Sequence, residues 1–180
     1  MTDLPDLGDA NLAGHLASGG RASWAAVAEL AEAFQPESWM VVGGQMVAIH
    51  AARSGVVMVR ATTDVDVVID VRAQRRVHAQ RLSGWLVESG FAIERNDEGT
   101  DRYRRGDARI DLLAPDNLGE PPVRTTEGGR ILAAPGSTNA LKRSGLIRVG
   151  LKGRPTAYPR APGLSAGREA AVEPESACRI

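Results

Sequence analysis

The chain has 180 residues, of which 43% are hydrophobic, and its 22 Lys and Arg residues balance 22 Asp and Glu residues. This length fits one domain. Zero formal net charge argues against a protein held to nucleic acid mainly by a basic face, and an aromatic content of 4% leaves few rings to stack on bases. The only cysteine, Cys178, excludes an intramolecular disulfide bond and a cysteine-based zinc site. Because neither a signal peptide nor an apolar stretch of ~20 residues is evident, we expect a cytoplasmic protein without membrane contact.

Hydrophobic periodicity predicts an alternation of helices and short strands. The segments with apolar side chains at helical spacing are residues 24–34, 45–52 and 74–88. The segments with strand-like composition are residues 39–42, 64–71, 91–93, 102–105 and 108–113, with shorter pieces near 130–132 and 147–149. Gly106-Asp107 is predicted to be a hairpin turn between two of these strands.

Composition divides the chain into three parts. Residues 1–20 show no sustained periodicity and are interpreted as a loose lead-in, followed by a domain over residues 21–157. From Lys152 onward, 17 of 29 residues are Ala, Gly, Pro or Arg. Such a segment buries too little apolar surface to offset its ordering entropy. We therefore predict a disordered or atypical tail over residues 158–180.

The strongest chemical signal is the pair Asp64 and Asp66 inside an apolar β run, because Asp is a poor strand former. Their spacing puts both carboxylates on one face of a strand. A divalent cation would relieve the repulsion between them, and oxygen ligands favour Mg²⁺ or Mn²⁺. Taken alone, the pair is explained equally well by solvated aspartates on an exposed strand.

Two further features accompany this pair. Gly43 and Gly44 follow an apolar strand and open a helix, where backbone N–H groups bind phosphate. Asp111 lies within the later strand 108–113 and would complete a cation site from a neighbouring strand. The alternative for Asp111 is a surface strand residue paired with an arginine such as Arg104 or Arg109.

The order of these motifs along the chain resembles the nucleotidyltransferase superfamily related to DNA polymerase β. The motifs are Val41-Val42-Gly43-Gly44, then His50, then Arg60-x-Thr62-x-Asp64-x-Asp66, and finally Asp111. They are most similar to its AbiEii/AbiGii-type toxin branch. The resemblance covers about residues 22–155 and implies an α/β (α+β) fold with a short mixed β-sheet flanked by helices. His50 itself is interpreted as a buried structural histidine rather than a catalytic base.

The resemblance implies transfer of an NMP from an NTP to a hydroxyl acceptor, with Mg²⁺ or Mn²⁺ as cofactor. By matching position, Asp64 and Asp66 would bind both metals, and Asp111 would bind the catalytic metal and help to activate the hydroxyl. Several toxin members modify the acceptor end of tRNA beside a cognate antitoxin, so tRNA and an antitoxin are expected partners.

The expected nucleotide-binding residues are Gly43, Gly44, Gln45 and Arg60. The glycines would cradle the triphosphate, and Arg60 would neutralise phosphate charge, although a salt bridge to Asp64 or Asp70 explains Arg60 equally well.

The sequence departs from this branch at its C-terminal end, where members continue into helices that supply a triphosphate-binding lysine. No Lys follows Lys152 here, so the chain reads as truncated relative to the branch. A catalytically silent nucleotide-binding relative is therefore the alternative function. A metal-dependent sugar-nucleotide glycosyltransferase that uses Asp-x-Asp is the third.

Overall fold

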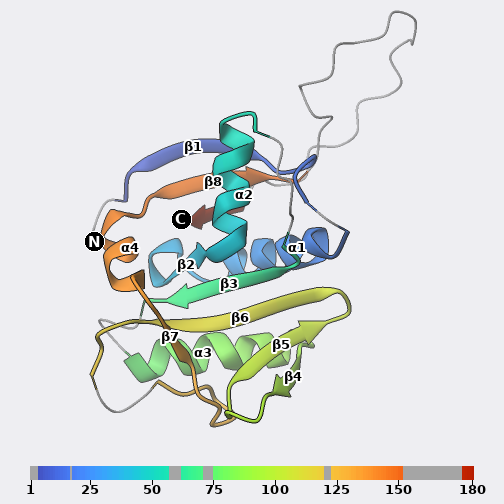
Figure 1. Ribbon diagram of the computed structural model, residues 1–180. Helices are drawn as coiled ribbons and strands as arrows, with labels where there is room; N and C mark the ends of the chain where they lie inside the picture. The colour runs from blue at the N-terminus through green and yellow to red at the C-terminus, as the bar shows by residue number, and fades with distance from the viewer. Residues whose placement is uncertain (1–3, 17, 57–61, 71–74, 120–122, 152–175) are drawn as a thin grey trace, which may run out of the picture.

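The computed structural model describes residues 4–16, 18–56, 62–70, 75–119, 123–151 and 176–180. Over these residues the chain forms four α-helices and nine strands in mixed sheets, which confirms the expected α+β class (Figure 1). The three-stranded sheet lies at the top of Figure 1 and α3 (Arg75–Glu88) at the bottom, with the long strands of the larger, six-stranded sheet between them. None of the helices in the described ranges is long and apolar enough to span a bilayer.

The larger sheet has six strands, and its middle pair is parallel. In spatial order it contains β2 (Trp39–Val42), β3 (Asp64–Ile69), β6 (Ala108–Pro115), β5 (Asp101–Arg105) and β4 (Ala92–Arg95), with β7 (Leu132–Ala134) also paired to β6. The β3–β6 and β6–β7 pairs are parallel, and the remaining pairs are antiparallel. The predicted hairpin at Gly106-Asp107 joins β5 to β6.

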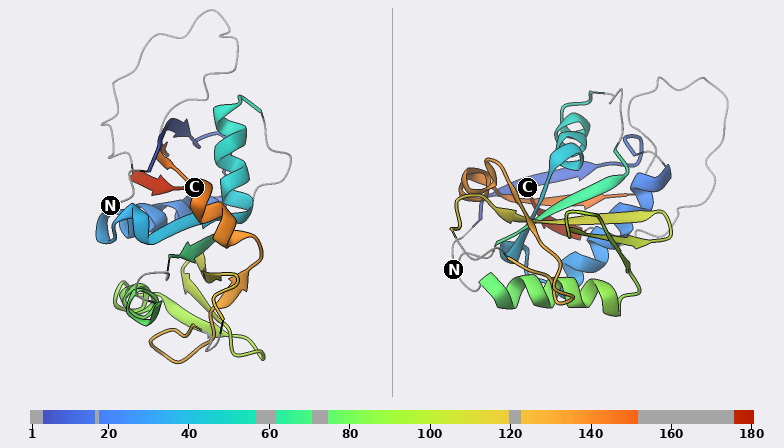
Figure 2. Two further views of the ribbon diagram at one scale, coloured as in Figure 1. Left: turned by 90° about the vertical axis from the view of Figure 1, so that its left-hand side faces the viewer. Right: turned by 60° about the horizontal axis from the view of Figure 1, so that its bottom comes forward.

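Strand alternation gives this sheet one apolar face and one mixed face, because successive side chains point to opposite sides. On β3, Val65, Val67 and Ile69 are buried, whereas Asp64 and Asp66 are half-buried on the other side. The helices α1 (Ser18–Ala33) and α3 cover the apolar face (Figure 2). On the mixed face, Leu141 of α4 (Ser137–Arg143) packs on the end of the sheet that carries the apolar side chains Met40, Val68 and Leu113.

A second sheet joins both ends of the chain. Its strands are β1 (Asp6–Asn11), β8 (Leu146–Gly150) and β9 (Ser176–Arg179), in that order. The helix α2 (Gly43–Arg53) contacts β1 as well as β2 and β3, and the short 3-10 helix η1 (Pro36–Ser38) lies against β9. The two sheets therefore share one hydrophobic core.

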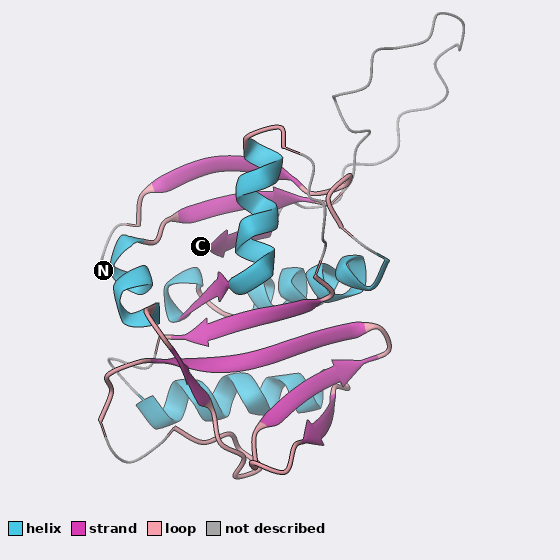
Figure 3. Cartoon of the chain, in the orientation of Figure 1, coloured by secondary structure: helices cyan, strands magenta, loops and turns pink. Residues whose placement is uncertain are grey.

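Both ends of the chain contain strands that the sequence analysis did not predict: β1 lies within the expected lead-in and β9 within the expected tail (Figure 3). Cys178 and Ile180, at the C-terminal end, are buried in the core. Each of these short strands is paired with β8, which is distant in sequence from β1, and four to six residues are too few for a local period to be evident. The rest of the expected tail, residues 158–175, lies outside the described residues.

Candidate functional site: a charged face of the larger sheet

Two rows of charged side chains cross the mixed face of the larger sheet. In the first row, Asp66 on β3 is the register partner of Asp111 on β6, Asp111 of Arg102 on β5, and Arg102 of Glu94 on β4. Register partners in neighbouring strands point to the same face. Asp66 and Asp111 therefore lie side by side, as the sequence analysis expected.

The second row lies one pleat away on the same face. Asp64 is the register partner of Arg109, and Arg109 is that of Arg104. Arg109 Nη1 lies 3.8 Å from Asp64 Oδ1, and Arg104 Nη1 donates to Glu94 Oε1 at 3.2 Å. The three predicted carboxylates thus share a face with three arginines, one of which, Arg104, is paired with Glu94.

Asp111 has a partner that the sequence analysis did not select. Arg102 donates from Nε to Asp111 Oδ1 at 2.8 Å and from Nη2 to Asp111 Oδ2 at 2.6 Å, a bidentate pair. The same Nη2 lies 3.8 Å from Asp64 Oδ2. Hydrogen bonding to Asp111 raises the pKa of Arg102, which stays protonated. The alternative expectation, that Asp111 on its strand pairs with an arginine, agrees with this contact, although the arginine is Arg102 and neither of the two given as examples.

Asp66 is the carboxylate least supported by its surroundings. Burial raises the pKa of Asp66, the charges of Asp111 and Asp64 raise it further, and Arg102 partly opposes them. Across the described part of the chain, no group donates a hydrogen bond to the Asp66 carboxylate. Asp64, in contrast, accepts a hydrogen bond from the Thr63 hydroxyl at 2.9 Å. Asp66 is therefore the position where a bound cation would relieve most repulsion.

The glycine pair packs directly against these residues. Gly43 has φ +66°, and a Cβ atom at Gly43 would overlap Asp66 Oδ2. A Cβ atom at Gly44 would lie 2.6 Å from Thr62 Cγ2. Both close approaches require the absence of a side chain. The first turn of α2 therefore begins beside the Asp66 carboxylate, as a phosphate-binding role requires.

The side chain of Gln45, one of the expected nucleotide-binding residues, is directed into the protein interior. Gln45 is 1% exposed: its Oε1 accepts from Trp24 Nε1 at 2.6 Å, and its Nε2 donates to the carbonyls of Thr62 at 3.0 Å and Asp64 at 3.3 Å. A buried amide must satisfy its polar atoms within the protein. Gln45 therefore fixes the start of β3 and the position of Asp64.

The two remaining predictions near this motif have different outcomes. Arg60 lies outside the described residues. His50 is exposed on α2, so its interpretation as a buried histidine is wrong. The helix α2 has only 11 residues, so its hydrophobic pattern is too short to show from sequence which face carries His50.

A cavity of about 390 Å³ opens beside the first charged row. Its walls include Asp66, Asp111 and Arg102, and Thr100 on the loop between β4 and β5. The Thr100 hydroxyl is buried without a hydrogen-bond partner among the described residues. Small-molecule sites commonly have volumes in this range and a few convergent polar groups. The cavity therefore brings acidic, basic and neutral polar groups to one ligand-sized space.

The residues fit a cation that arrives with a ligand better than a resident one. Within the described ranges, no three Asp, Glu, His or Cys side chains form a group able to hold a metal ion. Arg102 holds Asp111 through two hydrogen bonds, whereas the arginine nitrogens nearest to Asp64 lie at 3.8 Å, so Asp64 and Asp66 are the more available carboxylates. Mg²⁺ commonly binds through one or two carboxylates together with substrate phosphates. This donor set suits such a cation.

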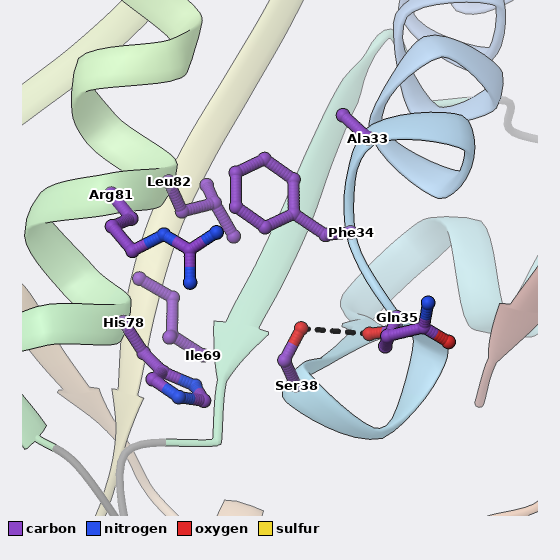
Figure 4. Close-up of a pocket in the computed structure, with 8 residues that line it drawn as sticks. All are labelled: Ala33, Phe34, Gln35, Ser38, Ile69, His78, Arg81 and Leu82. Carbon is purple, nitrogen blue, oxygen red and sulfur yellow. Dashed lines mark hydrogen bonds between the residues drawn. The ribbon is translucent and has the colours of Figure 1, made fainter.

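A second cavity, of about 290 Å³, lies on the opposite, apolar side of the sheet. Figure 4 shows Phe34, Ile69 and Leu82 along its walls, with His78 and Arg81 of α3 at its rim. Ile69 points away from the face of Asp64 and Asp66, because it lies an odd number of residues from them along β3. This cavity is therefore separate from the charged rows.

Comparison of the chain with models of known protein families, with curated proteins and with solved structures finds no match.

Sequence reasoning missed Arg102 as a site residue, although a signal for it was present. Arg102, Tyr103 and Arg104 alternate basic, aromatic and basic, which indicates a strand with one charged face. The residues around Asp111 in β6 also alternate between apolar and polar side chains. Only the register of β5 against β6 decides which arginine meets Asp111.

Proposed function

We propose that this protein is a Mg²⁺- or Mn²⁺-dependent nucleotidyltransferase that transfers an NMP from an NTP to a hydroxyl acceptor. The observation that carries the proposal is the convergence of Asp64, Asp66 and Asp111 on one sheet face, with the Gly43 turn packed against Asp66. Carboxylates beside a helix N-terminus combine cation and phosphate binding in one place. The motif resemblance gives the reaction class.

In this proposal the chain's residues orient the substrates. The first turn of α2 would hold the triphosphate, and Asp64 and Asp66 would hold a divalent cation, which would supply positive charge to neutralise the phosphates. Asp111 orients the acceptor hydroxyl for in-line attack on the α-phosphorus. A bond forms between the acceptor oxygen and that phosphorus, the hydroxyl proton passes to the Asp111 carboxylate, and the bond to the bridging oxygen breaks so that pyrophosphate leaves.

The resemblance also provides the proposed partners. We propose an RNA end, with tRNA first among the candidates, as the hydroxyl acceptor, and a cognate antitoxin as a protein partner. A cytoplasmic location is proposed as well. It fits a chain whose single cysteine, Cys178, is a buried free thiol.

A catalytically silent nucleotide-binding relative is the second candidate, and one observation favours it. Arg102 holds both oxygens of Asp111, the residue expected to activate the hydroxyl. Such a protein would bind Mg²⁺ and NTP without transfer. A sugar-nucleotide glycosyltransferase is less favoured, because it gives the contact between Gly43 and Asp66 no role.

The test is calorimetry with each of the four NTPs, with and without Mg²⁺, followed by transfer from α-labelled NTP to RNA. We expect binding that requires Mg²⁺ and is lost in Asp66→Asn. The matched control is Asp107→Asn, which removes an exposed carboxylate in the β5–β6 turn and should bind like the native chain. Absence of Mg²⁺-dependent binding for every NTP would contradict the proposal. Mg²⁺-dependent NTP binding without transfer would favour the catalytically silent relative. Turnover of a sugar nucleotide but of no NTP would favour the glycosyltransferase.

A further inference from the structure

Arg102 places a positive charge where the proposed function needs a cation. Its guanidinium makes two hydrogen bonds to Asp111 and lies 3.8 Å from Asp64 Oδ2. With Asp66 beside Asp111 in the register, the guanidinium stands against the three carboxylates that would surround a divalent ion. It therefore acts as their counter-ion.

Arg102 is positioned so that this pairing is exchangeable. Its side chain is 44% exposed and forms part of the cavity wall, so release from Asp111 returns the guanidinium to a polar space and leaves no void in the core. A half-exposed ion pair contributes little to stability because water solvates both partners after separation. A ligand in the cavity would meet Arg102, Asp66 and Asp111 together.

A divalent cation and Arg102 compete for the same carboxylate. A cation bound by Asp111 would face a guanidinium a few ångströms away, and like charges at that distance repel. A phosphate group offers Arg102 a bidentate partner of the same geometry as a carboxylate. Phosphate in the cavity would therefore draw Arg102 from Asp111 and free this carboxylate for the cation.

We propose that Arg102 is a positioning residue that couples the binding of cation and nucleotide: it blocks Asp111 in the absence of phosphate and moves to the triphosphate when the nucleotide binds. This inference rests on the proposed function. It requires that the cation binds weakly alone and more tightly with nucleotide. By thermodynamic reciprocity, the nucleotide gains the same factor from the cation.

The experiment measures Mn²⁺ affinity by electron paramagnetic resonance, with and without an α,β-methylene NTP that cannot be cleaved at the α-phosphorus. Native chain, Arg102→Gln and Arg104→Gln are compared. We expect Arg102→Gln to bind Mn²⁺ alone about tenfold more tightly than the native chain and to lose most of the gain from nucleotide. Arg104, which pairs with Glu94 on the same strand face, is the matched control and should behave like the native chain.

The outcomes separate this inference from the proposed function. If the native chain binds Mn²⁺ and nucleotide together and Arg102→Gln shows the same affinity for Mn²⁺ alone or a lower one, the coupling role is overturned and the function stands. If neither chain binds Mn²⁺ with the nucleotide, both are overturned. Arg102→Lys keeps the charge but not the bidentate geometry, and an intermediate Mn²⁺ affinity in it supports the inference if Arg102→Gln does not fold.

Discussion

Two arginine–aspartate pairs in this protein have opposite surroundings. The Arg102–Asp111 pair lies on the open face of the larger sheet, with side chains 44% and 20% exposed. The Arg179–Asp70 pair lies between the two sheets, with side chains 4% and 11% exposed. The same two residue types thus form an exchangeable contact in one region and a fixed one in the other.

The difference lies in the neutral acceptors around each guanidinium. Arg179 donates to Ser144 Oγ at 2.6 Å, to the carbonyl of Leu141 at 2.6 Å and to that of Glu37 at 2.8 Å, besides Asp70. A buried guanidinium requires such acceptors, because its charge is costly to remove from water. Arg179 therefore fastens β9 to α4 and η1. Arg102 has water and a cavity as alternatives.

The largest expected effect is on stability in the fixed region. Arg179→Met removes all four of these hydrogen-bond partners at once and should lower the free energy of unfolding by about 3 kcal/mol. Arg102→Gln should change it by less than about 1 kcal/mol. Urea denaturation of both variants provides the measurement. Equal losses would show that the two pairs do not differ in the way proposed here.

A second prediction compares two glycine variants to separate the effect of a steric clash at the site from that of backbone strain. Gly43→Ala and Gly55→Ala both place a side chain at positive φ, +66° and +65°, but only the Cβ at position 43 meets another residue, Asp66. Gly55→Ala should lose about 1 kcal/mol of stability from backbone strain, and Gly43→Ala should lose more because Asp66 must also shift. Gly43→Ala should also weaken Mg²⁺-dependent NTP binding by about tenfold, as loss of support for a metal ligand does. Calorimetry showing equal binding in both variants would remove Gly43 from the site.

On the open face that carries the Arg102–Asp111 pair, the ionised Asp66 carboxylate should destabilise the folded state. Its pKa is raised in the folded state, so its contribution to stability is present below the unfolded value of 3.8 and is lost as pH rises through the folded value. Asp66→Asn removes the half-buried negative charge, so its free energy of unfolding at neutral pH should be about 0.5–2 kcal/mol higher than that of the native chain. NTP binding should be lost in the same variant. The advantage of Asp66→Asn should grow from pH 4 to pH 7 in urea denaturation. A constant difference across this range would contradict the assignment.

The smallest expected effect is on the rate at which Cys178, near the Arg179–Asp70 pair, is alkylated. Burial raises the pKa of Cys178 on β9 to about 12, so the folded chain presents little thiolate. Alkylation at pH 8 should proceed at least ~100-fold more slowly than in the urea-unfolded chain. Arg179→Met should accelerate it by loosening β9. Rapid alkylation of the native chain would show that β9 is not stably docked.

Local sequence pattern predicted the elements that build the candidate site. The alternation in Asp64–Ile69 and around Asp111 correctly placed the carboxylates on polar faces, because side-chain direction in a strand depends only on position parity. The glycine pair was correctly placed at the start of a helix, since a strand followed by Gly-Gly and an apolar period is a local signal. The nucleotidyltransferase activity stays a prediction.

The features that the sequence did not predict depended on distant partners. The Gln45 side chain lies next to the glycine pair in sequence, but its polar atoms bind Trp24 and the backbone carbonyls of Thr62 and Asp64. Strand β9 has too few apolar residues to indicate burial by itself, and β8 provides its pairing.

The sequence by itself determined the faces of the strands and the residue types available on each face. Only the tertiary structure decided that Arg102, rather than Arg104 or Arg109, binds Asp111, and that Arg179 returns to the core. The physical reason is that side-chain alternation is a property of one strand, whereas register and burial are set by contacts between segments far apart in the chain.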